Sequence, residues 1–188
     1  MVKFQIARRG IENVRVLKAM SEVPREEFVL DSCREEAFED SPLPIGYGQS
    51  SSQPFTVAFM ARAAILQGPE KVRELGTGSG YGAAVLSQLA AEVHSVERVP
   101  ELAAEAAGRI KRLGYANVTV HTANGTLGLP EHAPFDAIVV TAGAEQLPEP
   151  YREQVAEGGR IVIPIGDSIA QSMCRFTKQK GELLRENL

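Results

Sequence analysis

The sequence has few of the residues that mark disulfide-bonded or metal-binding proteins. Its two cysteines, Cys33 and Cys174, lie far apart and form no CxxC pair. We therefore expect free or buried thiols in a reducing compartment and no disulfide. The three histidines, His94, His121 and His132, are scattered and lack metal-ligand spacing. We expect them to be structural, and we expect no metal site.

Long hydrophobic runs are also missing. No stretch approaches the roughly 18 apolar residues of a membrane span, and the start at Met1–Gln5 lacks the apolar run of a signal peptide. The formal net charge of −4 argues against nucleic acid as the main partner. Nothing marks a self-complementary apolar surface. These absences predict a cytoplasmic monomer that binds neither membranes nor nucleic acid.

The composition that remains is that of an ordinary globular domain. The chain has 188 residues, 44% apolar and 23% charged, without repeats or a dividing linker, which excludes disordered, collagenous and coiled-coil proteins. We expect one domain over residues 1–188. It should comprise an N-terminal helical part with a substrate loop (1–54), an α/β core (55–166) and a C-terminal strand region (167–188).

Strands and helices alternate through the core. Apolar residues recur at helical spacing near Ile11–Met20. Further helices are expected at Phe55–Leu66, Tyr81–Ala91, Pro100–Leu113 and Glu149–Ala156. Strands are expected at Lys71–Leu75, Val93–Val96, Val118–His121, Phe135–Thr141, Arg160–Pro164 and Gln171–Thr177. The apolar run Ala137–Val140 is typical of a central parallel strand covered on both faces. The alternation predicts an α/β fold with a doubly wound, mostly parallel sheet and an N-terminal helical extension.

A glycine-rich turn joins the first core strand to the next helix. Glycines in Glu74–Tyr81 allow a sharp turn and close approach of a ligand, and Glu97 follows at the end of the next strand, where an acid can accept hydrogen bonds from a ribose. Gly78–Ala83 also fits the dinucleotide fingerprint, so NAD is an alternative. Glu74 would repel a pyrophosphate and favours a cationic cofactor such as S-adenosylmethionine.

Taken together, several stretches resemble the protein-L-isoaspartate methyltransferase family. The resemblance covers about residues 10 to 184 and is carried by Val23–Val29, Pro42–Pro54, Glu74–Tyr81, Pro134–Thr141 and Gly158–Gly166. The stretch Pro42–Pro54 is specific to this family, whereas many methyltransferases share the glycine turn.

The resemblance implies a Rossmann-like methyltransferase that uses S-adenosylmethionine to esterify the α-carboxyl of L-isoaspartyl residues in damaged proteins and peptides. The ester then collapses to a succinimide, which begins repair. It implies that Ser52 is the active-site residue. The residues expected to bind the cofactor are Glu74, Gly76, Thr77, Gly78, Ser79, Gly80, Tyr81, Glu97, Asn124, Gly125 and Thr141. Those expected to bind the substrate are Ile45, Gly46, Gln49, Ser50, Ser51, Gln53, Pro54 and Ala142.

Two features depart from the family pattern. Asn124 stands where the family usually has an aspartate that contacts the adenine amino group; its side-chain oxygen can still accept a hydrogen bond. Relatives usually continue past the equivalent of Leu188 with strand-forming sequence, so the sequence is compatible with a natural or a shortened C-terminus. Two rival functions stay open: a small-molecule methyltransferase, and a catalytically weak protein that binds the cofactor or isoaspartyl peptides.

Overall fold

A mostly parallel sheet forms the centre of the computed structural model, which describes residues 1–167 and 170–188. Its strands within these residues are β3 (Lys71–Leu75), β4 (Glu92–Glu97), β5 (Val118–Thr122), β6 (Phe135–Val140), β7 (Val155–Gly166), β8 (Gln171–Gln179) and β9 (Glu182–Asn187). They lie in the order β5-β4-β3-β6-β7-β8-β9. The five neighbours β5, β4, β3, β6 and β7 pair in parallel, and β8 and β9 extend the sheet by antiparallel pairing. The predicted fold class is confirmed.

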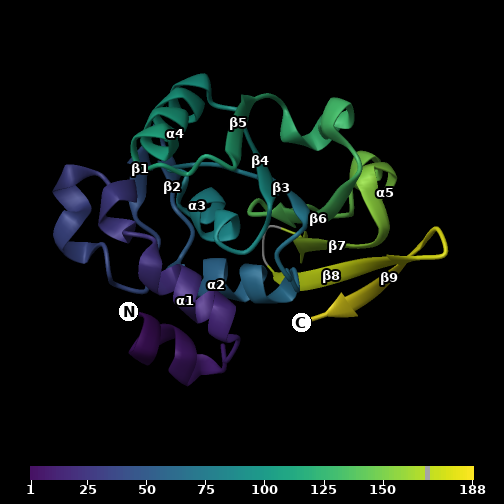
Figure 1. The fold of residues 1–188 in the computed structure, drawn as a ribbon, viewed down its shortest axis with the longest axis horizontal. Coiled ribbons are helices and arrows are strands. Elements are labelled where there is room, and N and C mark those ends of the chain that lie inside the picture. Colours follow the sequence, from purple (N-terminus) through teal and green to yellow (C-terminus); the bar gives the residue numbers. More distant parts are fainter. Residues whose placement is uncertain (168–169) are drawn as a thin grey trace.

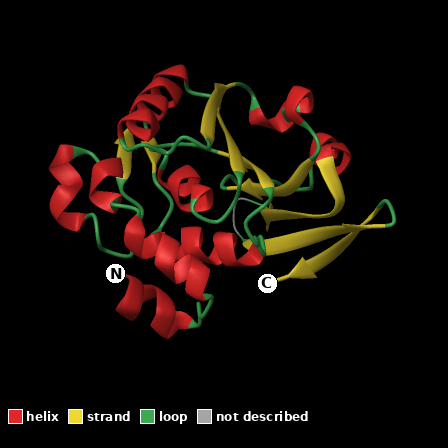
Figure 2. Ribbon diagram, viewed as in Figure 1, coloured by secondary structure: helices red, strands yellow, loops and turns green. Residues whose placement is uncertain are grey.

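Helices cover both faces of this sheet. They are α1 (Val14–Glu22), α2 (Pro54–Ala63), α3 (Tyr81–Ser87), α4 (Pro100–Arg112) and α5 (Glu149–Gln154). Figure 1 shows α1 and α2 gathered with the N-terminal segments at one side, whereas the β8–β9 hairpin projects from the opposite side. Helix α5 and the short helices η5 (Gly125–Leu127) and η6 (Pro130–His132) lie apart from α1 to α4 (Figure 2).

Two apolar cores follow from the alternation of side chains along the strands. Ala137 and Val139 of β6 belong to the core beneath α1, α2 and α3. Ile138 and Val140 of the same strand belong to the core beneath α5. Successive strand residues point to opposite faces, so the uninterrupted apolar run is buried on both sides, as predicted.

The N-terminal segments are held by polar contacts that lead toward the substrate loop. The Asn13 side chain accepts a hydrogen bond from Val16 N and caps α1. The buried Arg25 guanidinium donates to the carbonyls of Ala37, Glu39 and Ser41. Three donations into one stretch of backbone fix the approach to residues 42–54. Two further short helices, η3 (Arg25–Phe28) and η4 (Asp31–Glu36), complete this part, after η1 (Val2–Ile6) and η2 (Ala7–Arg9).

Element ends differ from the sequence-based prediction where tertiary pairing decides them. The predicted helix Tyr81–Ala91 ends at Ser87, and the predicted helix Glu149–Ala156 ends at Gln154. In the second case Val155 already pairs with Phe135, so β7 begins there instead of at Arg160. Strand β9 and the hairpin of β1 (Pro44–Gly46) and β2 (Gln49–Ser50) were not predicted. Short polar strands carry little periodic signal.

Cys33 and Cys174 are free and buried, as predicted. Among the helices of the described residues, none has both the length and the apolar character needed to cross a bilayer. Residues 168–169 of the expected C-terminal region 167–188 lie outside the described part of the chain.

Candidate active site

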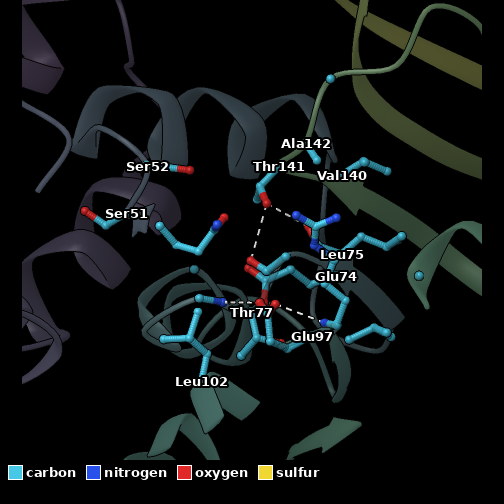
Figure 3. Close-up of a pocket in the computed structure, with 18 of the residues that line it drawn as sticks. Ser51, Ser52, Glu74, Leu75, Thr77, Glu97, Leu102, Val140, Thr141 and Ala142 are labelled. Atoms are coloured by element: carbon cyan, nitrogen blue, oxygen red, sulfur yellow. Dashed lines mark hydrogen bonds between the residues drawn. The ribbon is translucent and has the colours of Figure 1, made fainter. Parts of the chain in front are cut away.

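A cavity of about 540 Å³ lies at the carboxyl ends of β3, β4 and β6. Ligands of open parallel sheets bind at this edge. The glycine turn, the serine-rich segment and the acids all contribute to its wall (Figure 3). The predicted residues that line it are Ile45, Gln49, Ser50, Ser51, Ser52, Glu74, Gly76, Thr77, Gly78, Ser79, Tyr81, Glu97, Asn124, Gly125, Thr141 and Ala142.

The turn after β3 depends on glycine at its first position. Gly76 has a φ of +89°, and a Cβ there would lie 2.2 Å from Thr141 Oγ1. The Thr141 hydroxyl donates to the Leu75 carbonyl over 2.7 Å. Gly76 therefore lets the ends of β3 and β6 meet at the cavity floor.

Glu97 fastens this turn from the end of β4. Its Oε2 accepts from Gly78 N at 2.9 Å, and its Oε1 accepts from Arg98 N at 2.9 Å and Val99 N at 3.1 Å. A carboxylate has about four lone-pair sites, so one remains after these three backbone donors. The buried acid thus holds the turn in shape and keeps acceptor capacity at the cavity wall.

Glu74 lies deeper in the wall and is fully buried. Ser95 Oγ donates to its Oε2 over 2.5 Å, and Thr77 Oγ1 lies 2.6 Å from Ser95 Oγ. A Cβ at Gly82 would lie 2.3 Å from Glu74 Oε1, so the carboxyl group packs against the first turn of α3. Burial raises the pKa of Glu74 to about 8; the hydrogen bond from Ser95 opposes this, and the nearby Glu97 adds to it. Glu74 is therefore largely protonated at neutral pH.

The serine-rich segment reaches the cavity through the β1–β2 hairpin. Ser51 Oγ accepts from Leu43 N at 3.1 Å, and Ser51 N donates to the Leu43 carbonyl at 2.8 Å. Figure 3 shows the Ser52 hydroxyl directed toward the cavity and Thr141, with the Ser51 hydroxyl turned the other way. Within residues 1–167 and 170–188 the Ser52 hydroxyl has no hydrogen-bond partner. The two adjacent serines thus differ: Ser51 holds the loop, and Ser52 faces the space beside the glycine turn.

Four residues of the predicted site do not line the cavity: Gly46, Gln53, Pro54 and Gly80. Gln53 Nε2 donates to Asp40 Oδ2 at 2.8 Å, and Asp40 Oδ1 accepts from Phe55 N at 2.8 Å. These contacts join residue 40 to the start of α2, with Pro54 as its first residue. Gly80 precedes α3 with a φ of +91°. In this structure these positions shape the backbone around the cavity.

Asn124 lines the cavity, but its acceptor atom is already engaged. Asn124 Oδ1 accepts from Thr126 N at 3.2 Å and from Thr126 Oγ1 at 2.8 Å, and so caps η5. The neighbouring Gly125 carbonyl accepts from the Tyr151 hydroxyl at 3.2 Å. The expected contact from Asn124 to a ligand amino group would have to share this oxygen.

Several cavity residues had no role in the sequence-based prediction, including Gly82, Arg98, Leu102 and Tyr151. Gly82 and Arg98 adjoin predicted site residues and were recognisable by position, whereas Tyr151 comes from α5 and only folding brings it to the wall.

One face of α4 also contacts this region. Arg109 Nη1 donates to the Ser79 carbonyl at 2.7 Å, and Glu105 Oε1 accepts from the Tyr47 hydroxyl at 2.8 Å. Glu101 and Glu105 are exposed, and Arg109 is half-buried. Helix α4 supports both the glycine turn and the hairpin.

The three histidines are not scattered, contrary to prediction. His94, His121 and His132 converge outside the cavity, with one ring nitrogen of each within 4.8 Å of the others. Spacing along the chain carried no sign of this, because the three residues come from β4, β5 and η6.

Comparison with known proteins places this cavity in a family. The family model described as protein-L-isoaspartate(D-aspartate) O-methyltransferase matches residues 1–188. A protein-L-isoaspartate O-methyltransferase of Syntrophobacter fumaroxidans is 53% identical over 92% of this chain and 81% of its own length. The corresponding protein of Geobacter metallireducens is 49% identical over 100% of this chain and 88% of its own.

Solved structures agree with the sequence comparison. A protein-L-isoaspartate O-methyltransferase superposes with a TM-score of 0.86 and 32% identity, over 97% of this chain; the chain spans 60% of that structure. A Plasmodium falciparum protein of this kind, in complex with S-adenosyl-L-homocysteine, superposes with a TM-score of 0.84 and 27% identity, over 97% of this chain and 90% of its own. The chain belongs to the protein-L-isoaspartate(D-aspartate) O-methyltransferase family.

Proposed function

We propose that this protein transfers a methyl group from S-adenosylmethionine to the α-carboxyl of L-isoaspartyl residues in damaged proteins and peptides, with Ser52 as its active-site residue. The observation that carries the proposal is that Ser52 and the glycine turn line one cavity. Family membership supplies the reaction class. The ester it forms closes to a succinimide without further enzyme action.

The residues of the cavity fit the family's cofactor. A volume of about 540 Å³ lies in the usual range for small-molecule sites. Gly76 and Gly78, both with positive φ, leave room for a ligand against the backbone. Glu97 offers a remaining acceptor to hydroxyl groups, and its carboxylate suits a cationic ligand. When bound, S-adenosylmethionine supplies an electrophilic methyl group on a positively charged sulfur.

The remaining cofactor contacts are proposed along the same wall. Thr77, Ser79, Tyr81 and Thr141 surround the turn, and Asn124 and Gly125 close the side next to η5. Gly80 acts indirectly, since it starts α3 without lining the cavity.

The chain needs no general base for this reaction. A carboxylate with a pKa near 3.5–4 is already ionised at neutral pH. The residues therefore have to position one carboxylate oxygen and leave it nucleophilic. The Ser52 hydroxyl can donate a single hydrogen bond to the other oxygen. An arginine would bind both oxygens and lower their nucleophilicity.

The substrate contacts come from the hairpin and the loop after β6. Ile45, Gln49, Ser50 and Ala142 line the cavity beside Ser52. Gly46, Ser51, Gln53 and Pro54 set the backbone of this segment, and an extended peptide can bind along it through main-chain hydrogen bonds. Recognition of the main chain would accept many protein sequences around one damaged residue.

Replacing Ser52 by alanine tests its role. We expect kcat/KM for an isoaspartyl peptide to fall by about 100-fold or more, the usual effect of removing one oriented donor, with nearly unchanged binding of S-adenosylhomocysteine. Steady-state methylation and calorimetric titration measure the two quantities. Ser21→Ala, at an exposed position of α1, is the matched control and should change neither. An equal loss of methylation and cofactor binding in S52A would contradict the assigned role.

One assay distinguishes the proposed activity from the two rival functions, a small-molecule methyltransferase and a binding protein. Release of methanol after incubation of the cofactor with an isoaspartyl peptide, and not with its aspartyl twin, is expected for the proposed activity. A small-molecule methyltransferase would act on neither peptide. A binding protein would retain the isoaspartyl peptide and release no methanol; the engaged oxygen of Asn124 is the observation that favours this alternative.

We further propose a cytoplasmic monomer that acts without nucleic acid or membrane partners. Two buried free thiols suit a reducing compartment, and the net charge of −4 disfavours binding to phosphate backbones. Sedimentation analysis of the purified protein tests the monomer.

A further inference from the structure

The three histidines of the chain form one cluster on the face of the sheet opposite α3. His94 in β4 and His121 in β5 share this face, because the register pairs His121 with Val96, two residues beyond His94. The chain then turns through η5 and η6 and brings back His132. The sequence contains three histidines in total, and all of them meet here.

The distances within the cluster suit a shared cation. His94 Nδ1 lies 3.0 Å from His121 Nε2, and His132 lies with its ring centroid 4.3 Å from that of His94 and 5.0 Å from that of His121. Zinc–nitrogen bonds of about 2.0–2.1 Å place two nitrogen ligands of a tetrahedral site about 3.3 Å apart. The first pair already stands near this separation, and a ring nitrogen of His132 lies within 4.8 Å of both.

A carboxylate behind the cluster is an independent sign of a metal site. His94 Nε2 lies 2.8 Å from Glu92 Oε1. A hydrogen on Nε2 that is donated to Glu92 leaves the Nδ1 lone pair directed at His121. Metal-binding histidines commonly hold their second nitrogen in this way, which fixes the tautomer and strengthens the ligand.

Charged side chains of both signs surround the cluster, and the acid Glu92 is the one in direct contact with a histidine. Glu92 contacts His94. Glu131 adjoins His132 in η6, and its negative charge favours a positive charge on His121. Lys71 is one opposing charge; its Nζ lies 5.5 Å from the centroid of Phe135, whose ring packs edge-on to His94. Arg73 is the other: its guanidinium lies 5.5 Å from the centroid of the same Phe135 ring and 4.5 Å from that of Tyr151. Two acids and two basic side chains thus surround the three imidazoles.

We propose that His94, His121 and His132 bind a divalent transition metal ion, zinc, with Glu92 holding His94 and water completing the coordination. Three imidazoles suit a borderline metal better than calcium or magnesium, which prefer oxygen ligands. None of the three histidines lines the cavity. The ion would tie β4, β5 and η6 together and so brace the connection from Thr122 to Pro134, which includes Asn124 and Gly125 of the cavity wall.

Titration of the chelator-treated full-length protein with zinc chloride tests the proposal. We expect one equivalent to bind and the melting temperature to rise, because an ion that binds only the folded state stabilises it. Cobalt(II) should give the intense visible bands of a four-coordinate site. His132→Asn should weaken zinc binding by about 100-fold or more, and Glu92→Gln by about 10–100-fold.

Controls separate this site from adventitious binding. Glu101→Gln, which removes an exposed acid on α4, and the double variant Cys33→Ser, Cys174→Ser should bind zinc like the unaltered protein. Circular dichroism in the presence of chelator shows whether His132→Asn folds. If it does not fold, the zinc affinity of Glu92→Gln, a change at a partly exposed position, tests the proposal. A titration without saturable binding or stabilisation, or equal zinc affinity in the folded histidine and Glu92 variants, would overturn the proposal and leave the cluster as packed neutral rings.

Discussion

Glu74 shows how a single residue can be shaped by the space around it. Its carboxyl group is enclosed by Ser95, Thr77 and Gly82, and burial raises its pKa to about 8. Burial in this enclosure costs less free energy for the neutral acid than for the charged carboxylate. Its protonation is therefore linked to the stability of the fold.

Glu74→Gln should flatten the pH dependence of stability. The folded protein keeps this proton up to about pH 8, whereas the unfolded chain releases it near 4.5. Between these values the folded state binds more protons, so the free energy of unfolding falls as pH rises, by at most about 1.4 kcal/mol per pH unit. Urea unfolding without cofactor, at about pH 5.5 and about pH 7.5, measures the slope. Glu101→Gln should keep the wild-type slope; a Glu74→Gln slope equal to it would contradict the raised pKa.

At the scale of elements, the β1–β2 hairpin is held by helix α4. Tyr47, between the two strands, has a φ of +52° and donates its hydroxyl to Glu105 at 2.8 Å. The side chain of Ile45 reaches the glycine turn, where its Cδ1 would lie 3.1 Å from a Cβ at Gly78. The hairpin is thus fixed at its tip by α4 and rests on the turn through Ile45.

Tyr47→Phe should loosen this element without removing it. Loss of one exposed hydrogen bond is expected to raise the KM for the peptide by about two- to tenfold, with little change in kcat, because Ser52 is anchored separately through Ser51. Steady-state kinetics and hydrogen exchange of residues 44–51 measure the two effects. Faster exchange with an unchanged KM would contradict the prediction, because it would show that the order of the hairpin does not affect substrate binding.

At the scale of the whole molecule, the cavity joins parts that are distant in sequence. Residues from the hairpin, β3, β4, the 124–126 segment, β6 and α5 all line it. A ligand that contacts all of these parts stabilises the folded chain as a unit.

S-adenosylhomocysteine should therefore raise the melting temperature, and NAD should not. At 100 times the dissociation constant, a ligand of the folded state adds about 2.7 kcal/mol, which corresponds to about 5–10 °C for a chain of this size. Differential scanning fluorimetry with each compound measures the shift. A comparable shift with NAD would favour the dinucleotide alternative over the proposed cofactor.

The local pattern of residues determined the architecture and most of the cavity wall. Alternating apolar stretches predicted β3 to β8, and Gly76, Glu97 and Ser52 stood out because strand ends, glycines and family motifs are local features of the chain. Strand β9 could not be predicted in this way, because its polar residues become a strand only when they pair with β8.

Tertiary structure alone decided which distant side chains meet. Arg109 reaches Ser79, Tyr151 joins the cavity wall, and His94, His121 and His132 converge although their spacing indicated nothing. The physical reason is that periodicity reports which face of an element is buried, whereas a contact between elements depends on strand order and register. Those are set by the packing of the whole chain.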